Sequence, residues 1–169
     1  MKVLGIDPGT ATTGYGLIET SDKGELKALK FDLIETDKKF SPQKRLELIY
    51  EEMLYLLEKH KPDVMSIEKI FFATNAKTAI RVGQALGVML LAASKSKTDV
   101  FEYAPGTIKK MVAGNGRADK KDMQKAIRKI LGNGVRSKPK KKTHFDNAAD
   151  GLAVAVCHVR KMNGGGDDK

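Results

Sequence analysis

The sequence predicts an α/β protein with a five-stranded mixed β-sheet flanked by α-helices on both faces. Three observations support this fold class. The first third of the chain alternates with the two-residue period of strands, and later segments carry the three- and four-residue apolar spacing of helices. The elements follow in the order β-β-β-α-β-α-β-α-α-α, which is a meander continued by strand–helix–strand crossovers.

Five segments have the composition of strands. Residues 2–7 form a short apolar run that ends at Pro8-Gly9, and residues 12–20 and 26–36 alternate on either side of a hairpin connection at 21–24. Residues 63–68 and 99–103 are further apolar runs, and each follows a predicted helix.

Five helices are expected between and after these strands. Ser41-Pro42 opens one that stops before Pro62, and its apolar stripe consists of Leu46, Ile49, Tyr50, Met53, Leu56 and Leu57. Residues 75–97 form a long helix in which Gly83 and Gly87 permit the close approach of another backbone. Shorter helices follow at 105–113, 118–131 and 144–161. We expect one domain over residues 1–162 and a disordered tail at 163–169.

Charge is concentrated in the last third of the chain. The 169 residues carry a formal net charge of +10. Residues 1–100 hold 15 basic and 14 acidic side chains, whereas residues 101–169 hold 16 and 7. This asymmetry indicates a polyanionic partner, most simply nucleic acid, although a solvated surface is the ordinary alternative.

Several classes of protein are disfavoured by the sequence. The longest apolar run, Ala85–Ala93, is too short to span a bilayer. Because Met1-Lys2-Val3 leads directly into a predicted strand, we expect no signal peptide. Cys157 is the single cysteine, which excludes a disulfide framework and a Cys-rich zinc site, and we expect it to be a packed core thiol. A cytoplasmic location is the simplest expectation.

Acidic residues fall where three predicted elements should converge. Asp7 and Glu68 end two apolar strands, and ligands of open α/β sheets bind beyond such carboxyl ends. Asp146, Asn147 and Asp150 lie about one turn apart near the start of the last helix. Each acid has an ordinary explanation, as a turn residue, a strand-end charge or a helix cap. Together they suggest Mg²⁺ or Mn²⁺ and, on a basic protein, phosphodiester hydrolysis assisted by two metal ions.

Five motifs in this order resemble the bacterial RuvC family of crossover (Holliday) junction endodeoxyribonucleases, which have a ribonuclease-H-like fold. The resemblance extends from Val3 to about His158. The motifs are Gly5-Ile6-Asp7-Pro8-Gly9-Thr10, Ile67-Glu68-Lys69-Ile70-Phe71-Phe72, Gly83-Gln84-Ala85-Leu86-Gly87, Phe101-Glu102-Tyr103-Ala104-Pro105 and Ala148-Ala149-Asp150-Gly151-Leu152-Ala153.

The resemblance assigns three of the family's four metal-binding acids to Asp7, Glu68 and Asp150. Two Mg²⁺ ions per site are implied, with Mn²⁺ able to substitute. The fourth family position carries Asn147, where the family has Asp or sometimes His. A neutral amide should weaken metal binding, so we hypothesise that Asn147 is an engineered change and that this chain is deficient in cleavage. Asp146, its neighbour, is a candidate substitute.

Other roles and partners are also implied by the resemblance. Phe71 matches an aromatic residue that wedges against bases at the crossover. Lys109 and Lys120 match basic positions near the scissile backbone, and Lys120 is expected to neutralise charge in the transition state. Arg117, Lys121 and the 136–142 loop would make less specific phosphate contacts. The family acts as a homodimer, through a helix similar to the Gly83/Gly87 helix, with RuvA and RuvB as partners in DNA recombination and repair. Close packing of that helix on the sheet is the alternative within one subunit.

Two other functions are compatible with parts of the sequence. An ATPase or kinase of the actin and sugar-kinase type also places a phosphate loop after a Gly-Ile-Asp strand end, but needs two such domains. A non-catalytic junction- or DNA-binding module fits the charge and Asn147. Metal-dependent strand scission would separate a nuclease from a binding module. The histidines at 60, 144 and 158 are not at metal positions of the family.

Overall fold

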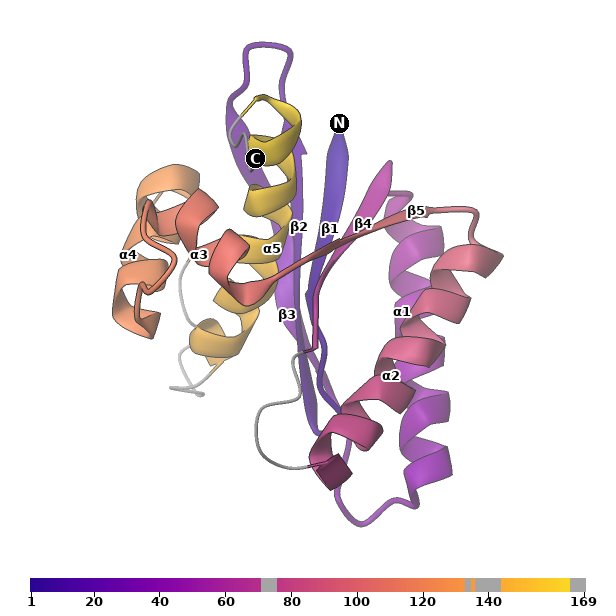
Figure 1. Cartoon of the computed structure of the whole chain (residues 1–169). Helices are drawn as coiled ribbons and strands as arrows, with labels where there is room; N and C mark the ends of the chain where they lie inside the picture. The colour runs from indigo at the N-terminus through magenta and orange to yellow at the C-terminus, as the bar shows by residue number, and fades with distance from the viewer. Residues whose placement is uncertain (71–75, 133–134, 136–143, 165–169) are drawn as a thin grey trace.

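The computed structural model describes residues 1–70, 76–132, 135 and 144–164, with the side chains of 144–146 excepted. Five strands form one mixed sheet in the order β3-β2-β1-β4-β5 (Figure 1). They are β1 (Lys2–Asp7), β2 (Thr12–Thr20), β3 (Leu26–Glu35), β4 (Val64–Glu68) and β5 (Asp99–Tyr103). The first three are antiparallel neighbours, and β1, β4 and β5 run parallel.

Helices cover both faces of this sheet, as the sequence predicts (Figure 1). Helices α1 (Pro42–His60) and α2 (Ala76–Lys95) share one hydrophobic core with the sheet. The opposite face is covered by α5 (His144–Met162), against which α3 (Pro105–Ala113) and α4 (Lys120–Leu131) pack. The sheet therefore separates two cores.

Local sequence signals set the helix ends. Ser41 caps α1 by accepting a hydrogen bond from the Lys44 amide, and Asp119 caps α4 in the same way for Asp122. All ten elements lie within two residues of their predicted bounds. Cys157 is fully buried as expected, and burial raises the pKa of its thiol to about 12.

Helix α5 lies directly on the sheet because glycines remove the intervening side chains. A Cβ atom on Gly5 would lie 2.2 Å from the carbonyl oxygen of Gly151, and one on Gly16 would lie 2.6 Å from the Leu152 amide nitrogen. Such distances leave no room for a side chain at these positions. The contact of Gly5 and Gly16 with the backbone around Gly151, called the glycine seam below, therefore fixes the distance of α5 from β1 and β2.

The α2 glycines do not make the contact that intrachain packing would require. A Cβ atom on Gly83 or Gly87 would meet nothing within 4 Å in the described structure, so close packing of these glycines on the sheet is wrong. Ile80 and Leu91, on the same side of α2, are 61% and 50% exposed. By length and composition, α2 is the one described helix apolar and long enough to span a membrane, and its other face packs into the core.

The last part of the chain is described only as far as Gly164. Asn163 and Gly164 form a turn after α5, and residues 165–169 lie outside the described residues. The single domain over residues 1–162 and the disordered tail therefore stay predictions.

Candidate metal centre and nucleic-acid interface

The alternation of β1 and β4 directs two acidic side chains to the same face of the sheet. Leu4 and Ile6 enter the core with α1 and α2, so Gly5 and Asp7 face α5. In β4, Met65 and Ile67 likewise enter that core, and Glu68 therefore also faces α5. The parallel register pairs Ile6 with Ile67, which makes Asp7 and Glu68 neighbours at the carboxyl ends of their strands.

Helix α5 brings Asp150 to this pair. Asp150 immediately precedes Gly151, the residue whose backbone contacts β1 and β2. All three carboxylates line one groove of about 310 Å³, together with Pro105, Ile108, Lys109, Asp119, Lys120, Met123 and Ala153. The groove thus joins two strand ends to α3, α4 and α5. The acids that the sequence predicts to converge do so.

Electrostatics show that negative charge is concentrated in this groove. Burial, and after it the charges of Glu68 and Asp150, raise the pKa of Asp7 to about 7 against an opposing effect of Lys120. Burial and the charge of Asp150 also raise the pKa of Glu68, while Lys109 and Lys120 lower it. The Lys120 Nζ atom lies 3.6 Å from Asp150 Oδ2. The two lysines therefore offset the repulsion only in part.

The donor chemistry fits a hard divalent cation. Carboxylate oxygens are the ligands that Mg²⁺ and Mn²⁺ prefer, and a cation would relieve the repulsion that raises the pKa of Asp7. Among the described residues, however, no three His, Cys, Asp or Glu side chains are gathered so as to hold an ion as they stand.

Asn147 lies on α5 one turn before Asp150. The backbone carbonyl oxygen of Asn147 packs against Gly14, where a Cβ atom would lie 2.0 Å from this oxygen. Gly14 is the register partner of Asp7. The backbone of Asn147 thus lies against β2 beside the end of β1, but Asn147 is not among the residues that line the carboxylate groove. Asp146 lies on α5, which begins at His144, and its side chain is outside the described part of the structure, so its predicted roles stay predictions.

The predicted DNA contacts have mixed outcomes. Lys109 and Lys120 line the groove, whereas Arg117 and Lys121 are exposed and do not line it. Phe71 and the 136–142 loop lie outside the described residues. His158 is buried, with its Nδ1 atom 2.8 Å from the Tyr103 hydroxyl, and serves the core. Asp119 also lines the groove, a position that its capping signal could not reveal.

Comparison with known proteins decides the family. Residues 3–158 match the model of the family described as "Crossover junction endodeoxyribonuclease RuvC". The chain belongs to the RuvC family. Its resemblance to this family, inferred from five motifs, is thereby confirmed.

Relatives of the family resemble the chain along nearly its whole length. Proteins named crossover junction endodeoxyribonuclease RuvC from Syntrophomonas wolfei and Caldicellulosiruptor saccharolyticus are 46% and 42% identical to it over 159 residues. The matches cover 94% of this chain and 88% and 92% of those proteins. A solved structure of Thermus thermophilus RuvC in complex with a Holliday junction substrate has a TM-score of 0.86 at 30% identity, covering 98% of this chain and 96% of that one. The predicted ribonuclease-H-like fold class is confirmed.

Proposed function

We propose that this chain cleaves four-way DNA junctions at the groove lined by Asp7, Glu68 and Asp150. The observation that carries the proposal is the convergence of three carboxylates with two lysines at the carboxyl ends of β1 and β4. Membership of the RuvC family supplies the reaction, hydrolysis of a phosphodiester at a crossover. The net charge of +10 suits binding to the DNA backbone.

The side chains of the groove have distinct tasks in this proposal. Asp7, Glu68 and Asp150 would hold two Mg²⁺ ions, with Asn147 at the fourth position. Bound there, the ions would lower the pKa of an attacking water and stabilise the leaving oxygen. Lys120, whose Nζ lies near Asp150, would neutralise charge that develops on the phosphate. Lys109, on α3, would bind the DNA backbone beside Glu68.

We also propose that two copies act together through the exposed face of α2. Ile80, Gly83, Gly87 and Leu91 form an apolar strip that is free to receive a second helix. A two-fold dimer presents two grooves to the two equivalent strands of a junction. RuvA and RuvB, a cytoplasmic location, and the DNA contacts of Phe71, Arg117 and Lys121 stay predictions.

Asn147 favours a second candidate function. Its amide offers one neutral carbonyl oxygen where a carboxylate would offer two charged ones, which weakens the case for a full metal complement. In this alternative, the chain binds junctions without cutting them. Binding experiments alone do not separate the two functions.

A junction-cleavage assay tests the proposal. A labelled mobile four-way junction is incubated with Mg²⁺ and one of four proteins: the unsubstituted chain with Asn147 (called wild-type in these experiments), Asp7→Asn, Asn147→Asp or Asp99→Asn. Asp99 is an exposed acid at the start of β5. We expect Asp7→Asn to abolish cleavage, Asn147→Asp to increase it and Asp99→Asn to leave it unchanged. Binding is measured in parallel with Ca²⁺. If neither the wild-type chain nor Asn147→Asp cuts while both bind, the binding module is correct.

A further inference from the structure

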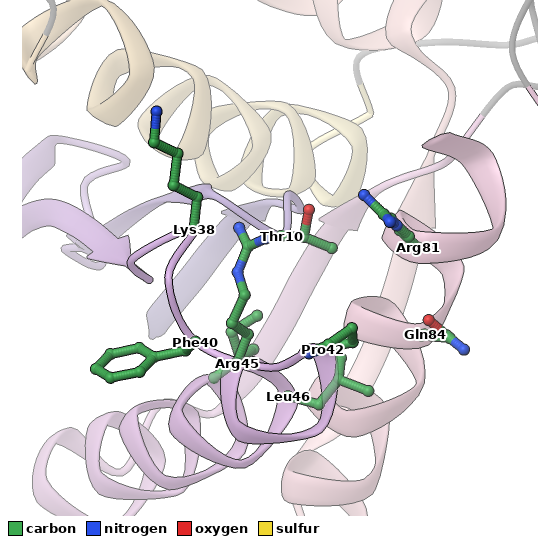
Figure 2. Close-up of a pocket in the computed structure, with 9 residues that line it drawn as sticks. Thr10, Lys38, Phe40, Pro42, Arg45, Leu46, Arg81 and Gln84 are labelled. Atoms are coloured by element: carbon green, nitrogen blue, oxygen red, sulfur yellow. The ribbon is translucent and has the colours of Figure 1, made fainter. Parts of the chain in front are cut away.

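A basic pocket lies on the other side of the β1–β2 turn from the carboxylate groove. It has a volume of about 210 Å³ and is lined by Thr10, Lys38, Phe40, Pro42, Arg45, Leu46, Ile49, Arg81 and Gln84. Three chain segments build it: the turn after β1, the start of α1 with the residues before it, and the N-terminal half of α2 (Figure 2). None of the functions assigned above uses these residues.

Arg45 is held in a fixed orientation at the pocket. Its Nε atom donates a hydrogen bond of 2.8 Å to the Thr36 hydroxyl, which in turn donates one of 2.5 Å to the Thr10 carbonyl oxygen. Thr36 is 7% exposed, so this relay is part of the packed structure. The bond uses one of five guanidinium N–H groups, and the remaining donors are available for a planar, bidentate contact.

The positive charge of the pocket is not neutralised from within. Arg45 and Arg81 approach Thr10 from α1 and α2, whereas the amino group of Lys38, at the rim of the pocket, points away from them (Figure 2). No acidic residue lines the pocket, and no carboxylate of the described residues pairs with these three cations. Three unpaired cations around an apolar floor of Leu46 and Ile49 favour an anionic ligand.

The pocket and the carboxylate groove are adjacent along the same edge of the sheet. A side branch of the groove is lined by Asp7, Pro8 and Val82, and the next residue back along α2 from Val82 is Arg81 of the basic pocket. Only the turn that contains Pro8 and Thr10 separates the two. A DNA strand that crosses Asp7 and Pro8 would pass around this turn, from the α5 side of the sheet to the side of α1 and α2, to reach Arg81 and Arg45.

We propose that this pocket binds a backbone phosphate of the junction strand beside the scissile phosphate. The inference rests on the proposed nuclease function and adds a second anchor for its substrate. A volume of about 210 Å³ is below the usual range of roughly 300–1,000 Å³ for whole small-molecule ligands, so a phosphate fits better than a complete nucleotide. Two arginines with a shared phosphate would fix the direction in which the strand leaves the groove.

Salt-dependent binding to a four-way junction in Ca²⁺ tests the pocket. We compare Arg45→Gln, Arg45→Lys and Arg81→Gln with Lys59→Gln, which removes an equal charge from the far end of α1. Each phosphate contact contributes about 0.9 to the slope of log affinity against log salt concentration. We expect Arg45→Gln and Arg81→Gln each to lower the slope by about that amount and Lys59→Gln to leave it unchanged. Arg45→Lys keeps the charge and should keep the slope while weakening affinity.

Replacing single backbone phosphates by uncharged methylphosphonates locates the phosphate that contacts the pocket. Single methylphosphonate groups are placed stepwise on either side of the cleavage point. We expect one position to weaken binding by the wild-type chain and to have no further effect on Arg45→Gln or Arg81→Gln. The proposal would be overturned if every methylphosphonate position and each arginine substitution weakened binding additively, or if the salt slopes were unchanged. The second result is also expected if the pocket binds a free phosphate or nucleotide instead.

The outcome is separable from that of the nuclease assignment. Arg81 makes no hydrogen bond within the described structure, so Arg81→Gln keeps the test valid if Arg45→Gln loosens the Thr36 relay. At saturating enzyme, we expect Asp7→Asn to bind and not to cut, whereas the control Lys59→Gln cuts at the same rate as the unsubstituted chain. Failure of both the unsubstituted chain and Asn147→Asp to cut would refute the nuclease function and leave the salt slopes to decide on the pocket.

Discussion

Gly5 of β1 and Gly151 of α5 are in direct backbone contact: a Cβ atom on Gly5 would lie 2.2 Å from the Gly151 carbonyl oxygen. Gly151 follows Asp150, and Gly5 lies two residues before Asp7 on the same face of β1. The contact therefore fixes the separation between two of the three carboxylates. In this fold, helix-on-sheet packing and assembly of the site are one structural feature.

Gly5→Ala should impair stability and cleavage together. The added methyl group has no space, so α5 must lift from β1, and we expect a loss of about 1–3 kcal/mol in the free energy of unfolding. Asp150 would move with α5, which should reduce cleavage even below the unfolding transition. Urea unfolding and single-turnover cleavage measure the two effects. Gly106→Ala, where the methyl group meets nothing within 4 Å, is the control. Full activity in Gly5→Ala would contradict the role of the seam.

Lys120 and Lys121 should differ in what they contribute. Lys120 Nζ lies 3.6 Å from Asp150, whereas Lys121 is exposed outside the groove. We expect Lys120→Gln to slow single-turnover cleavage on the order of 10²-fold, as loss of one stabilising group at a transition state commonly does. Lys121→Gln should instead weaken binding and reduce its salt slope while leaving cleavage at saturation unchanged. Equal effects of the two substitutions on the cleavage rate would argue against the assignment of Lys120.

Buried His158 should make the protein less stable in acid. Burial lowers the pKa of His158, and its Nδ1 atom lies 2.8 Å from the Tyr103 hydroxyl. Below pH 6.5, the ordinary pKa of histidine, His158 binds a proton in the unfolded chain but stays neutral in the folded chain. The contribution of His158 to the free energy of unfolding is therefore complete above pH 6.5. It is lost as pH falls towards the lowered pKa of His158 in the folded state, by up to about 1.4 kcal/mol per pH unit.

Urea unfolding between pH 5 and pH 8 checks this dependence. His158→Asn should show a shallower decline in stability than the wild-type chain over pH 5–6.5. His60, whose pKa is also lowered by burial and by nearby Lys30, Lys59 and Lys2, remains in both proteins and accounts for a shared part of the slope. Parallel curves for the two proteins would show that His158 does not contribute.

The exposed face of α2 should control the oligomeric state. Gly87→Glu places a bulky charge in open space within one chain, so the subunit should fold normally. Across a two-fold axis, two such charges would meet, and we expect sedimentation equilibrium to show a monomer in place of a dimer. Tyr55→Lys changes another exposed apolar side chain, on α1, and should leave the dimer intact. A Gly87→Glu dimer of wild-type stability would place the interface elsewhere.

The fold was largely predictable because its elements carry strong local signals. Alternation in β1 and β4, the Ser41 and Asp119 caps and the stripe of α1 each depend on nearby residues only. Strand-end acids could be expected to converge because parallel strands finish at one edge of a sheet. Packing between distant segments was not predictable in this way. The sequence drew attention to Gly83 and Gly87, which are open within the chain, whereas Gly5, Gly16 and Gly151 make the close contacts.

The basic pocket shows the same limit. Lys38, Arg45 and Arg81 are ordinary surface cations in sequence, and only the tertiary structure brings them to one cavity beside Thr10. A bond such as that from Arg45 to Thr36 leaves no signal in the periodicity of α1. The candidate site at the carboxyl ends of β1 and β4 was nonetheless predictable, because Asp7 and Glu68 end these strands directly.

Binding of Mn²⁺ to the DNA-free protein tests most directly whether Asp7, Glu68 and Asp150 form a metal centre. Electron paramagnetic resonance measures free Mn²⁺ during titration of the wild-type chain, Asp7→Asn, Asp150→Asn and Asn147→Asp. We predict that loss of either carboxylate weakens binding on the order of tenfold or more and that Asn147→Asp strengthens it. Mn²⁺ binding by Asp7→Asn and Asp150→Asn that matches the wild-type chain would contradict the metal centre.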